Sequence, residues 1–195
     1  MKFIMTLRAR RTATVVLVLI AITFHQEIQA SVYSLLGRSA QTLSSEEERL
    51  LREILPQAND FSIKGGDPPH YRAYRSDAEA GTRKLVGFAF LTTDVEPLER
   101  GYEGPIEMLV GLNTEGAITS LRVLEHHEPY GYFSIERPAF VTQFEGKSIL
   151  ERFRVGRDVD AVTRATITIR SASRVIRKSA RQIARKFLVQ EQDLK

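Results

Sequence analysis

The chain has 195 residues, contains no cysteine and carries a formal net charge of +4. Its length suits one domain with a short leader. The lack of cysteine excludes disulfides, cysteine-ligated iron–sulfur clusters, thiolate zinc sites and cysteine nucleophiles, so a redox role would need an organic cofactor or a haem without cysteine attachment.

The positive charge is concentrated at the two ends of the chain. Residues 1–11 contribute +4, and residues 147–195 contribute +8 from thirteen basic and five acidic side chains, so the middle carries −8. A basic end beside an acidic body is compatible with binding to nucleic acid, anionic lipid or a phosphate-bearing ligand. A solvated helix face is the simplest interpretation.

The first thirty residues have the pattern of an export leader. A basic start precedes the apolar run 12–24, and the small residue Ala30 follows, as in a secretory signal. Ile28 is too large for a typical cleavage site, so an uncleaved membrane anchor is the alternative. We expect residues 1–30 to be signal peptide or anchor and residues 31–195 to be a periplasmic domain. Export weakens the nucleic-acid interpretation, and we expect no nucleic-acid partner.

The first half of the exported part predicts a helix, a loop and two strands. Residues 44–48 (SSEEE) combine a hydroxyl cap with carboxylates suited to a helix N-terminus, and the helix should end before Pro56. Residues 59–69 are rich in glycine and proline and predict a loop. Strands are expected at 71–74 and 85–91, the second being apolar on both faces like a central strand.

The second half predicts a hairpin and a long helix. Apolar residues alternate over 106–112, a turn follows at 113–116, and 117–124 returns. Short helical turns are expected at 138–144 and 148–153. Residues 172–187 place apolar side chains at three- and four-residue spacing opposite a basic face. These elements predict an α+β fold: an antiparallel, twisted, half-barrel-like sheet packed against helices, with a long amphipathic helix at the C-terminus.

The segment Glu125-His-His-Glu128 invites a metal interpretation. Adjacent residues on a strand point to opposite faces, so His126 and His127 would not easily share one ion. We therefore favour a polar pocket rim and expect no metal. Motifs for dinucleotide, P-loop, serine-hydrolase or zinc-protease chemistry do not occur in the sequence.

A threonine-rich segment, residues 160–168, precedes the last helix. Hydroxyls and free backbone N–H groups at a helix entrance can bind an anion, with help from the helix dipole. The competing interpretation is helix capping by Thr168 and Ser171, which local chemistry alone favours.

This segment resembles the flavinylation motif of the FMN-binding domain family, in which an Asp, two residues and a Ser or Thr are followed by Gly, Ala and Thr. Asp160, Thr163, Ala165 and Thr166 match, and Arg164 replaces the glycine. The family includes the flavin subunits of the Rnf complex and of the sodium-pumping NADH:quinone oxidoreductase, and the periplasmic domain of NosR.

The resemblance covers about residues 45–188 and is greatest to the NosR-type domain. It includes the segments Gly101–Ile106 (GYEGPI), Leu109–Gly111 (LVG) and Glu125–Pro129 (EHHEP). NosR proteins continue into transmembrane helices and cysteine-rich segments, whereas this chain contains no cysteine. We therefore expect a stand-alone flavin domain.

The resemblance implies an exported electron carrier with FMN linked to Thr166 by a phosphoester. A flavin transferase that uses FAD and magnesium would attach the FMN, and the domain would relay electrons between a membrane redox system and an exported acceptor. It would be a carrier rather than a catalyst with its own substrate. Residues implied to lie near the cofactor are Asp160, Thr163, Arg164, Ala165, Thr166 and Thr168, with His126, His127, Glu128 and Tyr130 at the rim.

Arg164 leaves two alternatives open. If the glycine of the family requires positive φ, arginine there costs about 1–2 kcal/mol. Its guanidinium could instead pair with the FMN phosphate. The alternative function is a NosR-like binding, assembly or regulatory module that lost the cofactor through Arg164.

Overall fold

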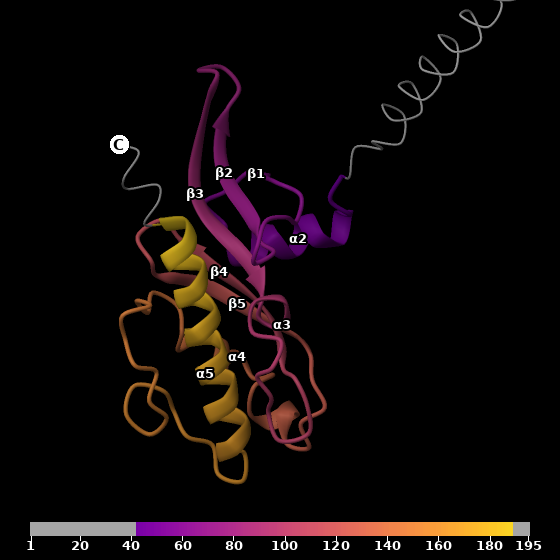
Figure 1. Cartoon of the computed structure of the whole chain (residues 1–195), viewed down its shortest axis with the longest axis vertical. Helices are drawn as coiled ribbons and strands as arrows, with labels where there is room; N and C mark the ends of the chain where they lie inside the picture. Colours follow the sequence, from indigo (N-terminus) through magenta and orange to yellow (C-terminus); the bar gives the residue numbers. More distant parts are fainter. Residues whose placement is uncertain (1–41, 189–195) are drawn as a thin grey trace, which may run out of the picture. The chain divides into compact units, whose positions relative to one another are not determined.

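The computed structural model describes residues 42–188 of the chain (Figure 1). The leader predicted at residues 1–30 lies outside this part. None of the helices in residues 42–188 is both long enough and apolar enough to cross a membrane.

The centre of the fold is a five-stranded antiparallel sheet in which each strand pairs with its neighbour in sequence, in the order β1-β2-β3-β4-β5. The strands are β1 (Asp60–Phe61), β2 (Tyr71–Asp77), β3 (Thr82–Leu91), β4 (Glu107–Asn113) and β5 (Ile118–Glu125). The predicted hairpin is β4–β5, and the predicted central strand is β3. The α+β class and the antiparallel sheet are confirmed.

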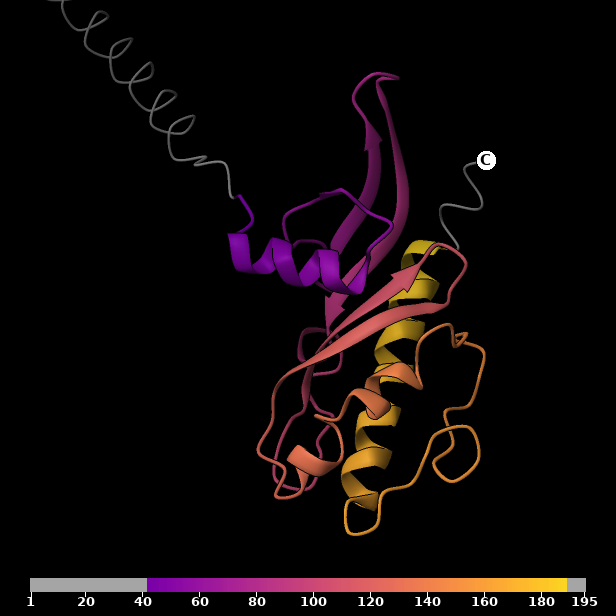
Figure 2. The same cartoon turned by 180° about the vertical axis from the view of Figure 1, so that it is seen from behind.

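The alternation of side chains along β3 explains why helices cover both faces of the sheet. Phe88 and Phe90 belong to the larger core, under helix α5 (Thr166–Ile183). Ala89 belongs to a smaller core under helix α2 (Ser45–Ile54). Successive residues of a strand point to opposite faces, so an apolar run of this length needs cover on both. Figures 1 and 2 show α5 and α2 on opposite sides of the sheet.

Helix α2 begins and ends where the sequence predicts. Ser44 accepts a hydrogen bond from the backbone of Glu47, whose side chain bonds back to the Ser44 backbone, so both halves of a capping box are present. The helix ends at Ile54, two residues before Pro56.

Helix α5 starts six residues earlier than its apolar pattern suggests, at Thr166, and continues as a π-helical turn, Ala184–Leu188. One side of the helix is buried against the sheet through Ile169, Ala172, Ile176, Ala180 and Ile183. The long amphipathic C-terminal helix is confirmed.

The basic face of α5 is more than a solvated surface. Arg174 and Lys178 both pair with Glu99, and their hydrogen bonds hold the pKa of that carboxyl below its usual value. Arg181 donates to the backbone carbonyls of residues 149–151, at 2.6–3.2 Å. These arginine and lysine side chains therefore fasten two loops to the helix.

Three local expectations need correction or extension. The strand β1 (Asp60–Phe61) lies inside the predicted loop, and a short helix α3 (Thr92–Val95) follows β3. Of the two predicted helical turns, the first forms as α4 (Pro138–Thr142). The second, at 148–153, is a turn without helix, because Phe153 has a left-handed φ of 49° and Arg181 occupies the carbonyls that a helix would use.

We expect Gly111→Ala to destabilise the domain by about 1–3 kcal/mol, the usual cost of overpacking. A Cβ at Gly111 would lie 2.4 Å from Thr119 Oγ1 and 2.8 Å from the Ile54 carbonyl oxygen, where α2 meets the sheet. Urea unfolding followed by circular dichroism measures the change. Gly104→Ala is the control, since no heavy atom lies within 4 Å of its Cβ. Equal effects of the two substitutions would contradict the close approach.

Candidate functional site

A cavity of about 590 Å³ lies at the N-terminal end of α5. Three segments far apart in sequence line it: Tyr102 and Glu103, Pro129 and Tyr130, and Arg164 with Thr166, Ile167 and Thr168. Three of these side chains, Tyr102, Tyr130 and Ile167, are large, apolar and 62%, 43% and 55% exposed. Exposed apolar side chains around one cavity, with a few polar groups, are typical of a small-molecule site.

The helix end that faces this cavity has no side-chain cap. Helix α5 begins at Thr166, and the N-cap residue Ala165 supplies no capping hydrogen bond. The first N–H groups of an α-helix have no partner within the helix, and the helix dipole adds partial positive charge there. The entrance of α5 is therefore suited to an anion, and the Thr166 hydroxyl stands beside it.

The capping interpretation of Thr168 and Ser171 is wrong. Both residues lie inside α5, because the helix begins at Thr166. Thr168 donates its hydroxyl to the carboxylate of Glu128 instead of to the helix backbone.

Arg164 has the left-handed backbone conformation that favours glycine, with φ of 68°. An L-residue in this region costs about 1–2 kcal/mol, so the strain considered for this position is present. Its side chain also lines the cavity together with Thr166. The structure thus combines two properties of Arg164: a strained backbone and a side chain that lines the cavity.

A buried carboxylate, Glu128, joins the segments that form the cavity. Its side chain is 6% exposed and accepts hydrogen bonds from the backbone N–H groups of Tyr102 (2.8 Å) and Glu103 (3.1 Å) and from the Thr168 hydroxyl. A Cβ at Gly101 would lie 2.2 Å from Glu128 Oε1, so the loop can approach only as glycine. Glu128 therefore acts behind the cavity wall, by positioning it.

The two histidines lie away from the cavity wall. His126 is half-buried; its Nε2 lies 2.9 Å from Glu136 Oε1, and its Nδ1 accepts from the Glu128 N–H. It therefore supports the turn that carries Glu128 and Tyr130. His127 is exposed. Among residues 42–188, no group of three or more His, Asp or Glu side chains could hold a metal ion.

The residues of the threonine motif, 160–168, do not all lie at the cavity. Arg164, Thr166 and Thr168 line the cavity, whereas Ala165 is buried. Thr163 is exposed and is not part of the wall. The Asp160 N–H donates to Gln143, and Asp160 borders a separate cavity of about 310 Å³.

Sequence reasoning missed Tyr102, Glu103, Pro129 and Ile167 as wall residues. Tyr102 belongs to the GYEGPI segment and Pro129 to EHHEP, so both stood within recognisable motifs. The hydrogen bonds of Glu128 connect these motifs to the start of α5.

Comparison with known proteins points to the same region. The model of the FMN-binding domain matches residues 101–181, which include every residue that lines the cavity. The chain is 30% identical to the regulatory protein NosR from Pseudomonas aeruginosa over 168 residues, which are 77% of this chain and 22% of that protein. With NosR from Stutzerimonas stutzeri it shares 31% identity over 155 residues, 74% of this chain and 20% of that protein.

A shorter relative is matched over most of its length. It is a component of the ion-translocating oxidoreductase complex from Vibrio atlanticus, and the chain is 31% identical to it over 168 residues, 81% of this chain and 75% of that protein. The chain spans about a fifth of the NosR relatives, 22% and 20% of their lengths. On the domain match and this similarity over three quarters of the relative's length, the chain belongs to the FMN-binding domain family.

Proposed function

We propose that this chain is an electron-transfer flavoprotein domain that holds FMN in the cavity at the start of α5, linked by a phosphoester to the Thr166 hydroxyl. The observation that carries the proposal is the position of Thr166. It is the first residue of an uncapped helix and lines a cavity of about 590 Å³ with exposed aromatic and aliphatic walls. Helix N-termini bind anions, and apolar cavities with a few polar groups bind small molecules, so the position of Thr166 combines both features.

The residues around Thr166 suit the phosphate of FMN. Free N–H groups at the first turn of α5 and the positive end of the helix dipole favour an anion. Arg164 lines the same cavity and can donate charge-assisted hydrogen bonds to a phosphate ester. These contacts would offset the backbone strain at Arg164.

The remaining wall suits the flat ring system of a flavin. Tyr102 and Tyr130 come from two segments far apart in sequence, and Ile167 adds aliphatic surface. Tyr130 is supported from behind by Phe133, with ring centroids 5.3 Å apart. Aromatic faces stack favourably on planar rings and have few rotamers to lose on binding.

Bound FMN would supply reversible transfer of one or two electrons, and the chain would supply position and electrostatics. The relatives named as components of an ion-translocating oxidoreductase complex support a membrane redox partner. We propose that residues 1–30 export or anchor the chain and that residues 31–195 act in the periplasm. A flavin transferase would modify Thr166, and the domain would relay electrons to an exported acceptor.

A second candidate is a binding, assembly or regulatory module of this family without FMN. The observation that favours it is the left-handed backbone at Arg164, a position where the family has glycine. In that case the arginine side chain would block the cavity entrance instead of pairing with phosphate.

We expect the chain to gain the mass of one FMN less one water when it is co-expressed with an exported flavin transferase. Thr166→Ala should abolish the gain, and Thr166→Ser should retain it, because serine keeps the hydroxyl. Intact-protein mass spectrometry and in-gel flavin fluorescence measure the modification. Thr82→Ala, at an exposed position of β3, is the control. Unmodified wild-type protein under these conditions would contradict the proposed covalent linkage.

We expect Arg164→Gly to raise the free energy of unfolding by about 0.5–1 kcal/mol. Relief of the left-handed strain gives about 1–2 kcal/mol, and the greater freedom of glycine in the unfolded chain offsets about 0.4–1 kcal/mol of it. Denaturant titration measures the change.

The same substitution separates the two candidate functions. In the Thr166→Ala background, FMN can bind only without a covalent link. There, Arg164→Gly should weaken FMN binding about tenfold, as expected for loss of a charge-assisted hydrogen bond. Flavin fluorescence titration gives the Kd. Arg164→Lys, which keeps a positive charge, should lose less FMN affinity than Arg164→Gly. If the chain is flavinylated only as Arg164→Gly, the module without FMN is the better description.

We expect Glu128→Gln to destabilise the domain by about 1–3 kcal/mol, because three hydrogen bonds lose the charged acceptor. Loosening of the Tyr102 loop should also weaken FMN binding. Thermal unfolding and FMN titration measure the two effects. Glu125→Gln is the control, since Glu125 is exposed at the end of β5. An unchanged FMN affinity would show that Glu128 does not position the cavity wall.

A further inference from the structure

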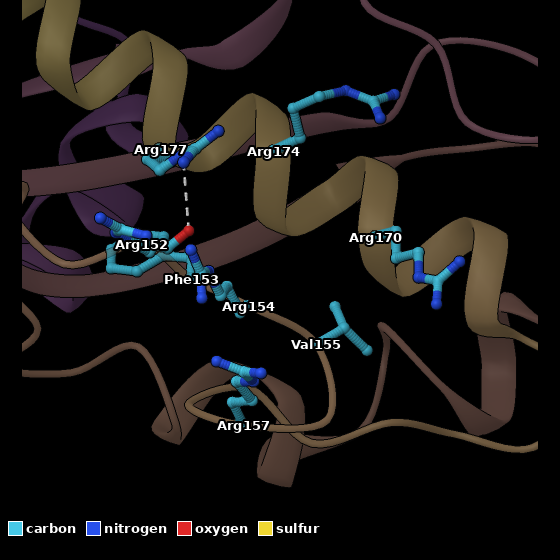
Figure 3. A pocket seen from close by; sticks show the side chains of 8 residues that line it. All are labelled: Arg152, Phe153, Arg154, Val155, Arg157, Arg170, Arg174 and Arg177. Atoms are coloured by element: carbon cyan, nitrogen blue, oxygen red, sulfur yellow. Dashed lines mark hydrogen bonds between the residues drawn. The ribbon is translucent and has the colours of Figure 1, made fainter.

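A second depression, of about 450 Å³, lies along the side of α5 and contains a cluster of arginines. Eight residues line it: Arg152, Phe153, Arg154, Val155, Arg157, Arg170, Arg174 and Arg177. Six of the eight are arginines, and none is acidic. We call this surface the arginine depression. Figure 3 shows Arg170 from α5 and Arg157 from the loop directed toward the space between these two elements.

The arginine depression lies on the same side of α5 as Thr166. Arg170 and Arg177 follow Thr166 by four and eleven residues, spacings that return to one side of an α-helix. At 1.5 Å per residue, they lie about 6 Å and about 16 Å along the helix axis from Thr166. A molecule bound in the arginine depression would therefore sit beside the cavity proposed for FMN.

The loop side of the depression is held in place from behind. Arg177 Nη1 donates to the Arg152 carbonyl at 3.2 Å. Phe153 is buried and meets Phe144 edge-on, with ring centroids 5.5 Å apart. The Arg154 N–H bonds to the carboxylate of Asp158. The guanidinium groups of this loop are thus presented on an ordered backbone.

Most of these positive charges lack an acidic partner within residues 42–188. Arg174 pairs with Glu99 at 2.8 Å. In the described part of the chain, no ion pair forms with the other five: Arg152, Arg154, Arg157, Arg170 and Arg177. Like charges gathered without counter-charge repel one another and attract an acidic partner over several ångströms.

We propose that the arginine depression is the docking surface for an acidic protein, which it places next to the FMN site. The choice of arginine over lysine suits bidentate binding of carboxylates in an interface. The surface is concave, which fits side chains projecting from a folded protein better than the plane of a bilayer. Leu150, two residues before Arg152 in the same loop, is 83% exposed and is available for an apolar contact with a partner.

The identity of this partner as a redox protein rests on the proposed function, but its binding does not require FMN. The test therefore measures binding by biolayer interferometry, with the full chain immobilised and two soluble probes: an acidic c-type cytochrome and a basic c-type cytochrome. Wild type and Thr166→Ala should bind the acidic probe equally at low salt, and added salt should weaken that binding steeply. The basic probe should not bind.

Charge reversal locates the surface. Arg154→Glu combined with Arg170→Glu should weaken binding of the acidic probe about tenfold or more. Arg185→Glu is the matched control: Arg185 is an exposed arginine that follows α5 and lies outside the depression, and its reversal should change the Kd less than about threefold. Arg154→Lys with Arg170→Lys keeps the charge but loses the bidentate geometry, so this pair should lose less affinity than the charge-reversed pair. A circular dichroism spectrum of the reversed pair that matches wild type excludes a folding defect.

Several results would overturn the proposal. Absent binding of the acidic probe at low salt, equal binding of both probes, or equal losses in the reversed pair and in Arg185→Glu would each do so. Binding to vesicles with anionic phospholipid but not to the acidic probe would assign the surface to lipid instead. Loss of flavinylation with intact binding of the acidic probe would overturn the proposed function and leave the docking surface standing.

Discussion

The buried carboxylate of Glu128 is the contact on which the site depends. Burial of a carboxylate is costly unless hydrogen bonds compensate for the lost water. Here the backbone N–H groups of Tyr102 and Glu103 and the hydroxyl of Thr168 supply that compensation. The same bonds that satisfy the charge hold the Tyr102 loop against the start of α5. The same hydrogen bonds therefore stabilise the buried carboxylate and shape the cavity.

Helix α5 combines three roles because three sides of one helix meet different surroundings. The side carrying Ile169 and Ile176 packs under the sheet and stabilises the core. Its uncapped start presents Thr166 to the cavity. A third side carries arginines that bind loop carbonyls, pair with Glu99 or line the arginine depression. The rigid helix thus keeps the proposed FMN site and the proposed docking surface at a constant separation.

Local sequence was sufficient wherever the relevant interactions are local. The Ser44 capping box, the alternation along β3 and the apolar spacing within α5 depend on neighbours a few residues apart, and the structure confirms all three elements. Prediction was wrong at 148–153 and for Thr168 as a cap. In both places a distant side chain, Arg181 or Glu128, competes for the groups that local structure would use.

The sequence by itself determined the α+β class, the family resemblance and the choice of Thr166 and Arg164 as candidate site residues. These follow from periodicity and from a contiguous motif. Only the tertiary structure decided that Arg164 has a left-handed backbone, that Tyr102 and Tyr130 share a cavity with Thr166, and that six arginines surround one depression. Those facts depend on contacts between segments far apart along the chain. No pattern within one segment specifies such contacts, since they arise only when the sheet, its loops and α5 pack together.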